Sequence, residues 1–249
     1  MKKVAIIIVV AVILIGAVVG GGYYWSKKQN EPPQTIEYKD IGEVDKDIVK
    51  LEPLQNAGKL SWQESYRLGI AYLQRGRTAD AAMTLEGVVK RHPDFYKTYE
   101  SLGMAYYKMD DMEKAASTWG KAVNMSPQAV HLNDMIARAK QKIEFKKRIS
   151  TLEQEIKNSQ VAWQKRFELA ALYIGMKRIE EAKAQLEEIV KVKKDSPEVY
   201  DAIAQAYAMS GDFEKAVNAE KKAVKLKPSD ENLKKRLEEM EKIQQAIKK

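Results

Sequence analysis

The chain has 249 residues, of which 31% are charged and 45% are hydrophobic, and it carries a formal net charge of +8 at pH 7. The absence of cysteine excludes disulfides, zinc–thiolate sites and thiol nucleophiles. With 13 glycines and 7 prolines the chain has too few turn residues for a β-sandwich, and the abundance of Ala, Leu, Glu and Lys after the N-terminus predicts an all-α fold.

Residues 1–25 are predicted to form an N-terminal transmembrane anchor. Lys2 and Lys3 precede a stretch, residues 4–26, that has no charged side chain and is long enough to cross a hydrocarbon layer of about 30 Å. Aromatic side chains near its end would meet the headgroups: Tyr23, Tyr24 and Trp25. A cleaved signal peptide is the alternative. Because the apolar run exceeds the usual signal core of about 7–15 residues, and cleavage leaves the aromatic cluster unexplained, insertion through residues 4–24 is favoured.

The charges around this segment predict its orientation. The N-terminal side carries two lysines and the terminal amine, against Lys27 and Lys28 on the other side, and the side richer in basic groups stays in the cytoplasm. This small margin favours a single-pass protein of the inner membrane with a periplasmic soluble part. The reverse topology, a cytoplasmic adaptor whose basic residues 138–148 touch anionic lipid, stays open. Residues 26–41, which include a Pro-Pro pair, are expected to be a linker.

Helical patterns then recur with a period of 34 residues. The first two copies share a Leu-Gly dipeptide followed by a tyrosine, and later positions keep the same shift: Leu68-Gly69, Tyr72, Ala81 and Pro93 match Leu102-Gly103, Tyr106, Ala115 and Pro127. Two further copies have Leu169-Ala170 with Tyr173, and Ile203-Ala204 with Tyr207. This pattern resembles the tetratricopeptide repeat. The resemblance covers about residues 62–129 and 163–230 and implies stacked pairs of antiparallel helices.

A larger duplication is visible at a shift of 101 residues. It maps Trp62 to Trp163 and Tyr72 to Tyr173, and it continues into the flanking segments. The expected fold is therefore an all-α helical-repeat solenoid of two related halves, each with two repeat pairs and flanking helices. The first module is placed at residues 42–145 and the second at residues 146–249. Residues 128–161 lack Gly and Pro, and one long helix or two shorter ones fit them equally.

In repeats of this kind the first helix of each pair lines a concave surface, so the resemblance implies a groove that binds protein. The expected groove residues are Tyr66, Ile70, Leu73, Met104, Tyr107, Phe167, Ile174 and Met209. All are apolar or aromatic, which suits a helix or an extended apolar peptide. The alternative is that some of them pack against a leading helix or the other half. Glu220 departs from the pattern at a position for a large apolar side chain, so the last repeat is expected to pack less tightly.

No sequence feature predicts catalysis or a cofactor. The chain lacks a Gly-rich phosphate loop, metal-ligand spacing and a nucleophile–base set, and the two histidines, His92 and His131, lie far apart. No nucleic-acid motif accompanies the basic residues. We therefore expect no catalytic, metal or cofactor residues and no enzyme. The favoured function is a membrane-anchored scaffold that binds protein partners in an envelope complex. A cytoplasmic adaptor and a homo-oligomeric structural protein are the alternatives, because stacked repeats with exposed end helices can associate.

Overall fold

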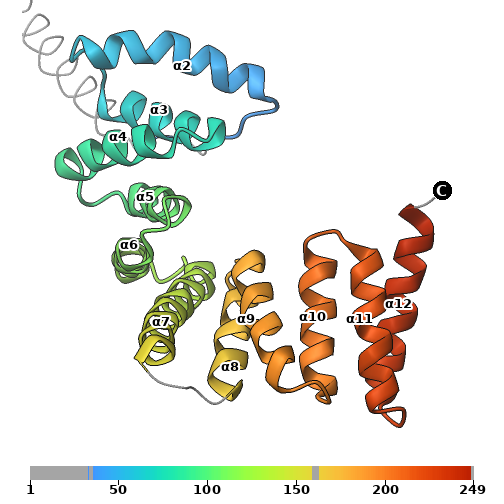
Figure 1. Cartoon of the computed structure of the whole chain (residues 1–249). Coiled ribbons are helices and arrows are strands. Elements are labelled where there is room, and N and C mark those ends of the chain that lie inside the picture. Colours follow the sequence, from blue (N-terminus) through green and yellow to red (C-terminus); the bar gives the residue numbers. More distant parts are fainter. Residues whose placement is uncertain (1–32, 34–35, 159–162, 248–249) are drawn as a thin grey trace, which may run out of the picture. The chain divides into compact units, whose positions relative to one another are not determined.

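The computed structural model describes residue 33 and residues 36–158 and 163–247, which form eleven α-helices and no β-strand (Figure 1). The prediction of an all-α helical repeat is therefore confirmed. These helices divide into two compact units, one ending at Lys140 and the other beginning at Gln141. The predicted anchor and most of the predicted linker lie outside the described residues. Across the described ranges, no helix combines the length and the apolar character needed to cross a membrane.

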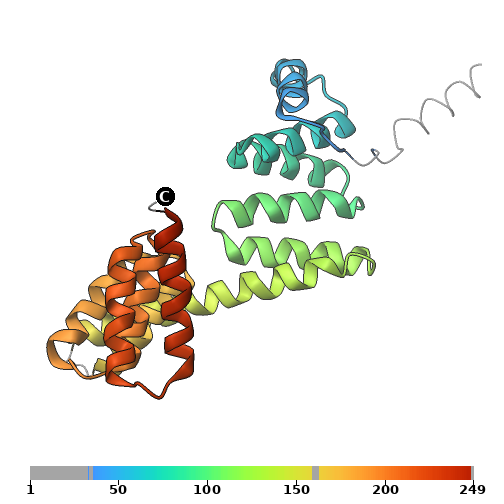
Figure 2. The same cartoon turned by 90° about the vertical axis from the view of Figure 1, so that its right-hand side faces the viewer.

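Unit 1 is a stack of helices, and each of its first five helices packs against its neighbour along the chain (Figure 2). Its helices are α2 (Ile41–Asn56), α3 (Trp62–Arg75), α4 (Thr78–Arg91), α5 (Tyr96–Lys108), α6 (Met112–Met125) and the first part of α7 (His131–Asn158). The pairs α3–α4 and α5–α6 are the first two predicted repeat copies, and α2 is the predicted leading helix. The apolar faces of α2, α3 and α4 share one core, which extends to Leu102 and Ala105 of α5.

Unit 2 repeats this order. It contains the rest of α7 and then α8 (Trp163–Gly175), α9 (Ile179–Val192), α10 (Pro197–Met209), α11 (Phe213–Leu226) and α12 (Glu231–Ile247). The pairs α8–α9 and α10–α11 are the third and fourth copies. The last helix, α12, lies alongside α11, as expected of a capping helix (Figure 1). Leu233 and Met240 of α12 are buried, while Ile243 and Ile247 are exposed.

Helix α7 contains two of the predicted flanking helices, the capping helix of the first half and the leading helix of the second half. It runs for 28 residues as a single helix, so residues 128–161 contain one long helix and not two. The positions 101 residues before α12 are residues 130–146, and the positions 101 residues after α2 are residues 142–157. Apart from residue 130, both ranges lie in α7. One helix therefore serves as the capping helix of the first copy and the leading helix of the second.

Small residues at the helix crossings allow close approach within each pair. An added Cβ at Gly69 would lie 2.7 Å from side-chain carbons of Leu85, and one at Gly103 would lie 2.4 Å from the ring of Trp119. Both distances are well inside van der Waals contact, so the second helix of each pair packs directly on the backbone of the first. The equivalent residues of unit 2 are Ala170 and Ala204, which are also buried.

All four turns inside the helix pairs use a residue with left-handed backbone. These are Gly76, Asp110, Lys177 and Gly211, with φ values of 81°, 63°, 60° and 82°. The left-handed residue lets the chain leave the helix while its amide still bonds to the preceding turn. At two of the four positions, Asp110 and Lys177, the residue has a Cβ, and this conformation is sterically unfavourable for it.

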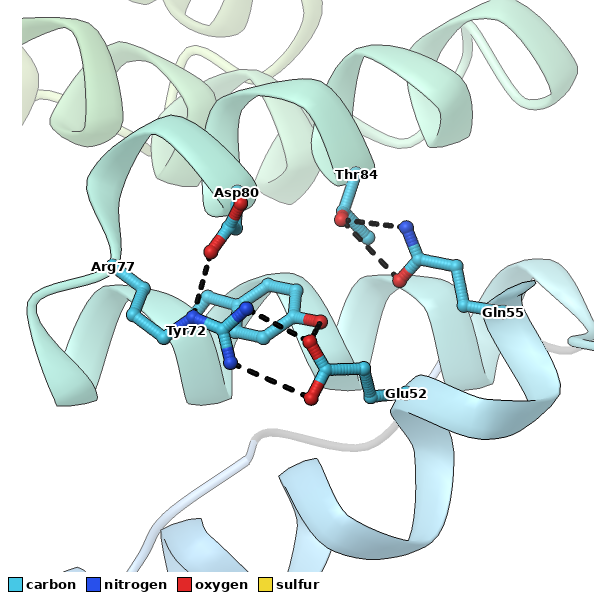
Figure 3. Close-up of polar contacts among 6 residues, drawn as sticks. All are labelled: Glu52, Gln55, Tyr72, Arg77, Asp80 and Thr84. Atoms are coloured by element: carbon cyan, nitrogen blue, oxygen red, sulfur yellow. Dashed lines mark hydrogen bonds and ion pairs between the residues drawn. The ribbon is translucent and has the colours of Figure 1, made fainter.

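A polar network attaches the leading helix α2 to the first repeat pair (Figure 3). The Tyr72 hydroxyl donates to a Glu52 oxygen at 3.0 Å, and the Arg77 guanidinium donates to Glu52 at 2.8 Å and to Asp80 at 2.6 Å. The guanidinium carbon of Arg77 also lies 4.3 Å from the centre of the Tyr72 ring. The bond from Arg77 lowers the pKa of Glu52, whereas burial and the Glu52 carboxylate raise the pKa of Tyr72 to about 12.

Three of these contacts recur in unit 2. The Tyr173 hydroxyl donates to Glu153 of α7, Arg178 lies 4.5 Å from the centre of the Tyr173 ring, and its guanidinium pairs with Glu181 at 2.9 Å. Each member is 101 residues from its counterpart in unit 1. The duplication therefore extends from the core residues to the polar contacts that place the leading helix.

Candidate functional site

A hollow with a volume of about 630 Å³ lies in unit 1. Helices α3 and α5, the first helices of the two pairs, supply most of its wall. Four predicted groove residues line it, namely Tyr66, Ile70, Leu73 and Met104. Tyr107 is not part of the lining, and its ring packs 5.6 Å from the ring of Trp119. We refer to this hollow as the unit 1 groove.

The groove also contains apolar side chains that sequence reasoning did not assign to it. They come from the segment before α2, from α6 and from α7: Ile36, Trp119, Leu132 and Met135. The repeat pattern assigns Trp119 to packing within its copy, because it holds the large apolar position there. Its side chain is buried under Gly103 and its Nε1 donates to the Glu100 carbonyl oxygen at 3.0 Å. The ring therefore belongs both to the core and to the groove floor.

The floor of the groove is continuous with the core. Tyr66 and Leu73 are only 7% and 9% exposed, and Ile70 packs against the core that α2 shares. The ring of Tyr66 meets Phe95 edge-on at 5.2 Å. The alternative considered above, that some groove residues pack against the leading helix, therefore holds in part. Met104 is half-buried and is not part of that core.

Charged side chains surround this apolar floor. Lys97, Glu100 and Lys108 of α5 reach the groove. Glu100 also meets the imidazole of His131, with 2.9 Å between Oε1 and Nε2. Charges of both signs at the edge and apolar side chains at the bottom form a surface that fits an amphipathic segment better than a uniformly charged one.

Phe167, Ile174 and Met209 belong to unit 2, and they are not among the residues that line the unit 1 groove. Phe167 and Ile174 are half-buried and pack against the cores of unit 2, with Phe167 at 6.4 Å from the ring of Trp163. Met209 is 49% exposed at the end of α10. The predicted groove residues therefore fall into two sets, one in each unit.

A charged cluster occupies the part of unit 2 that corresponds to the groove. Asp201, Glu220 and Arg236 are the counterparts of Glu100, Trp119 and Met135. The Arg236 guanidinium lies 2.9 Å from an Asp201 oxygen and 3.4 Å from a Glu220 oxygen. Glu220 has no exposed surface, and burial, together with the Asp201 carboxylate, raises its pKa to about 7.

The sequence led us to expect looser packing of the last repeat at Glu220. The structure shows an ion pair with Arg236 at this position. The Glu220 side chain is buried, and it faces α12 through Arg236. A carboxylate and a guanidinium take the space that an indole and a thioether fill in unit 1. The two units thus present different chemistry at equivalent positions, with an apolar groove in unit 1 and a charged cluster in unit 2.

The described parts of the chain contain no group of three His, Asp or Glu side chains placed to hold a metal ion. His92 stacks on Trp62, with 4.3 Å between ring centres. Of the basic residues at 138–148, Arg148 is paired with Glu168. These contacts are structural, and they assign no chemistry to the side chains involved.

Comparison with known proteins identifies the repeats. The family model described as tetratricopeptide repeat matches residues 66–130 and 167–231, which together make up just over half of the chain. Superkiller protein 3 of Schizosaccharomyces pombe is 22% identical over 176 residues, a region that spans 66% of this chain and 13% of that protein. The chain therefore matches only a small part of this curated relative.

Two solved structures are also similar to this chain. MamA from Desulfovibrio magneticus RS-1 is 17% identical, with 74% of this chain and 85% of that chain covered and a TM-score of 0.33. A thermophilic tetratricopeptide repeat protein from Thermus thermophilus is 18% identical, with 80% and 91% covered and a TM-score of 0.32.

Proposed function

The chain belongs to the tetratricopeptide repeat family, whose members mediate protein–protein interactions, and we propose that it is a membrane-tethered scaffold that holds a partner protein in the unit 1 groove. One observation carries this proposal, namely the hollow of about 630 Å³ between α3, α5 and the start of α7, with an apolar floor. Ligand-binding clefts in proteins have volumes of about 300–1,000 Å³, so this hollow is large enough to hold part of a bound molecule.

The chemistry of the groove suggests the form of the partner. Methionine side chains adapt their shape to a bound surface, and Met104 and Met135 line the groove together with Trp119. An amphipathic helix or an extended apolar segment would place its hydrophobic side chains on this floor. Its polar residues would then face Lys97, Glu100 and Lys108 at the edge. We propose a protein segment of this kind as the occupant, and we propose no catalytic role.

The membrane tether is the second part of the proposal. Residues 4–24 are uncharged and largely apolar, and they would anchor the chain in the inner membrane with the repeats in the periplasm. This arrangement suits a scaffold that gathers the components of an envelope complex. Protease treatment of spheroplasts tests the orientation. Digestion of the repeats from outside supports it, and protection of the repeats until the membrane is lysed favours a cytoplasmic adaptor.

Site-specific crosslinking tests the groove. A photoreactive amino acid is placed at Met104 in the full chain in cells, and the matched control carries it at the equivalent position of unit 2, Gln205. The proposal expects a discrete adduct from position 104 that Ile70→Glu abolishes while the circular dichroism spectrum stays helical. Identical adducts from both positions, or none from position 104, would refute the groove as the binding site. An adduct with the mass of two copies would identify homo-oligomerisation instead.

A further inference from the structure

Unit 2 contains a second hollow, of about 320 Å³, on the side of α10 that faces α9 and α11. We name it the α9–α11 hollow. Its floor is apolar and comes from Val190 and Ile203, and two aromatic rings, Tyr200 and Tyr207, stand beside them. It is separate from the groove side of α10, where Asp201 meets Arg236. The proposed function makes no use of this hollow.

The duplicated unit shows why the hollow is open. In unit 1 the hydroxyl of Tyr106, the counterpart of Tyr207, donates to Glu86 at 2.6 Å and ties α5 to α4. The counterpart of Glu86 is Glu187, but within the described residues the Tyr207 hydroxyl has no hydrogen-bond partner. Thr118 of unit 1 is also replaced by the smaller Ala219, which lines the hollow. At this place unit 2 therefore lacks the hydroxyl–carboxylate bond of unit 1 and carries a smaller side chain.

The hollow is also more basic than its counterpart. Lys183 and Lys215 place their ammonium nitrogens 5.1 and 5.4 Å from the centre of the Tyr207 ring, and Lys222 lies 5.5 Å from that of Tyr200. Lys225 extends the row of α11 lysines by one turn. Two of these lysines have no basic counterpart in unit 1, because Lys183 corresponds to Ala82 and Lys225 to Asn124.

Ion pairs neutralise part of this charge. Lys183 pairs with Glu180 at 2.7 Å and Lys215 pairs with Asp212 at 3.0 Å. Lys222 and Lys225 are exposed and have no ion pair within the part of the chain that the structure describes. Opposite them, Glu187 of α9 is the one carboxylate in the wall of the hollow. The unbalanced positive charge therefore lies along α11, on one side of an apolar floor.

We infer that the α9–α11 hollow binds an acidic peptide segment of a partner protein, with one apolar or aromatic side chain inserted between Tyr200 and Tyr207. The inserted side chain covers the floor and stacks against the rings. Carboxylates beside it reach Lys222 and Lys225, the α11 lysines without an ion pair among the described residues, and the Tyr207 hydroxyl donates to the same acceptors. The scaffold then has two binding sites with different preferences, an apolar groove in unit 1 and an acidic-peptide site in unit 2.

Fluorescence anisotropy with the full chain tests this inference. The probe is a fluorescein-labelled peptide with one phenylalanine between two aspartates on each side. Two control peptides replace the phenylalanine by alanine or the aspartates by asparagine. Lys222→Glu is expected to weaken probe binding about ten-fold, because it reverses a free charge beside the site. The matched variant Lys121→Glu, at the equivalent position of unit 1, is expected to change the dissociation constant less than two-fold.

Several outcomes would overturn the inference. Equal losses in Lys222→Glu and Lys121→Glu would mean that the probe follows overall charge, and equal binding of the asparagine peptide would mean that the lysines play no part. Binding to vesicles of anionic lipid without binding to the probe would assign the row to a membrane surface. Loss of probe binding in Met104→Glu would place the peptide in the unit 1 groove, which would refute this inference and leave the proposed function standing.

Discussion

Asp47 on α2 and Arg148 on α7 occupy equivalent positions in the two halves of the chain, yet they carry opposite charges. Asp47 pairs with Arg67 of α3, and Arg148 donates to both oxygens of Glu168 of α8, at 2.6 and 2.7 Å. Since Arg67 and Glu168 are also equivalent, the whole ion pair is reversed between the copies. Each leading helix therefore attracts the first repeat helix of its own unit and would place like charges against that of the other.

Reversing one member of this pair is expected to destabilise unit 1. Asp47→Arg places two guanidinium groups together, and adding Arg67→Glu restores a pair of the unit 2 type. Because Arg67 is half exposed, we expect a coupling free energy of about 0.5–1 kcal/mol. Urea denaturation of the four proteins in a double-mutant cycle measures it. Raising the salt concentration should shrink the coupling, and a double variant no more stable than either single one contradicts this account.

The close approach at Gly103 predicts a large effect of one methyl group. Gly103→Ala would push a Cβ to 2.4 Å from Trp119, and we expect a loss of about 1–3 kcal/mol through overpacking. The matched control is Gly120→Ala on α6, where an added Cβ meets no atom within 4 Å. Helix propensity should there give a gain of about 0.5–1 kcal/mol. Similar thermal midpoints for the two variants would show that the crossing has room to relax.

The left-handed turns predict that one lysine costs stability. Lys177 has a φ of 60° and an exposed side chain, so Lys177→Gly removes a steric cost and loses few contacts. We expect a gain of about 0.5–1 kcal/mol after the greater entropy of the unfolded glycine chain is subtracted. Gly211→Ala, at the equivalent turn of the next pair, should lower stability by a comparable amount. Chemical denaturation of both variants checks the opposite signs.

Glu220 predicts an unusual dependence of stability on pH. Its pKa is raised to about 7 in the folded chain, above that of an exposed glutamate at about 4.3. Between these values the folded chain holds a proton that the unfolded chain has lost, so this group makes stability fall as pH rises from about 4.5 to 7. Outside that window its contribution does not vary with pH.

Thermal melts from pH 4.5 to 8 test this prediction against Glu220→Gln. The amide cannot ionise, so the variant should lose this component of the pH dependence and be relatively more stable at pH 8. The ionised carboxylate would share one guanidinium, that of Arg236, with Asp201. Parallel curves for the two proteins would mean that Glu220 has an ordinary pKa in the folded chain.

The repeat architecture was predictable because each copy carries small and large residues in a fixed order. Gly69 and Gly103 lie under Leu85 and Trp119, and this pairing appears in the sequence as a 34-residue period. The turns were harder to foresee. Glycine at position 76 signals a left-handed residue, but Asp110 and Lys177 adopt the same conformation without any such signal.

The groove was predicted only in part. Tyr66, Ile70, Leu73 and Met104 were found because the first helix of each pair follows the repeat register. Its remaining walls come from a second helix and from a flanking helix, through Trp119, Leu132 and Met135, and no register for the first helix identifies these side chains. Whether the groove binds a protein stays a prediction, as do the membrane anchor and its orientation.

A search for repeat patterns could not predict the differences in charge and polarity between the two units. A repeat pattern records which positions are buried, and Glu220 at such a position reads as a weak match. Only the arrangement in space places Arg236 of α12 beside it. Sequence comparison of the halves shows the substitution, and the structure supplies the reason that it is tolerated.

The single helix α7 also bears on how an array of this kind can grow. A block of 101 residues starts as one flanking helix and finishes as another, and α7 shows that two such blocks join inside a helix without an added loop. An engineer could therefore splice a third block in the middle of that helix, keep the helical phase, and avoid the entropy of closing a new connection. The ion pair between the leading helix and the first repeat helix has opposite signs in the two blocks. The charges at positions 47 and 148 could therefore select which block follows which, because a wrong order would bring like charges together.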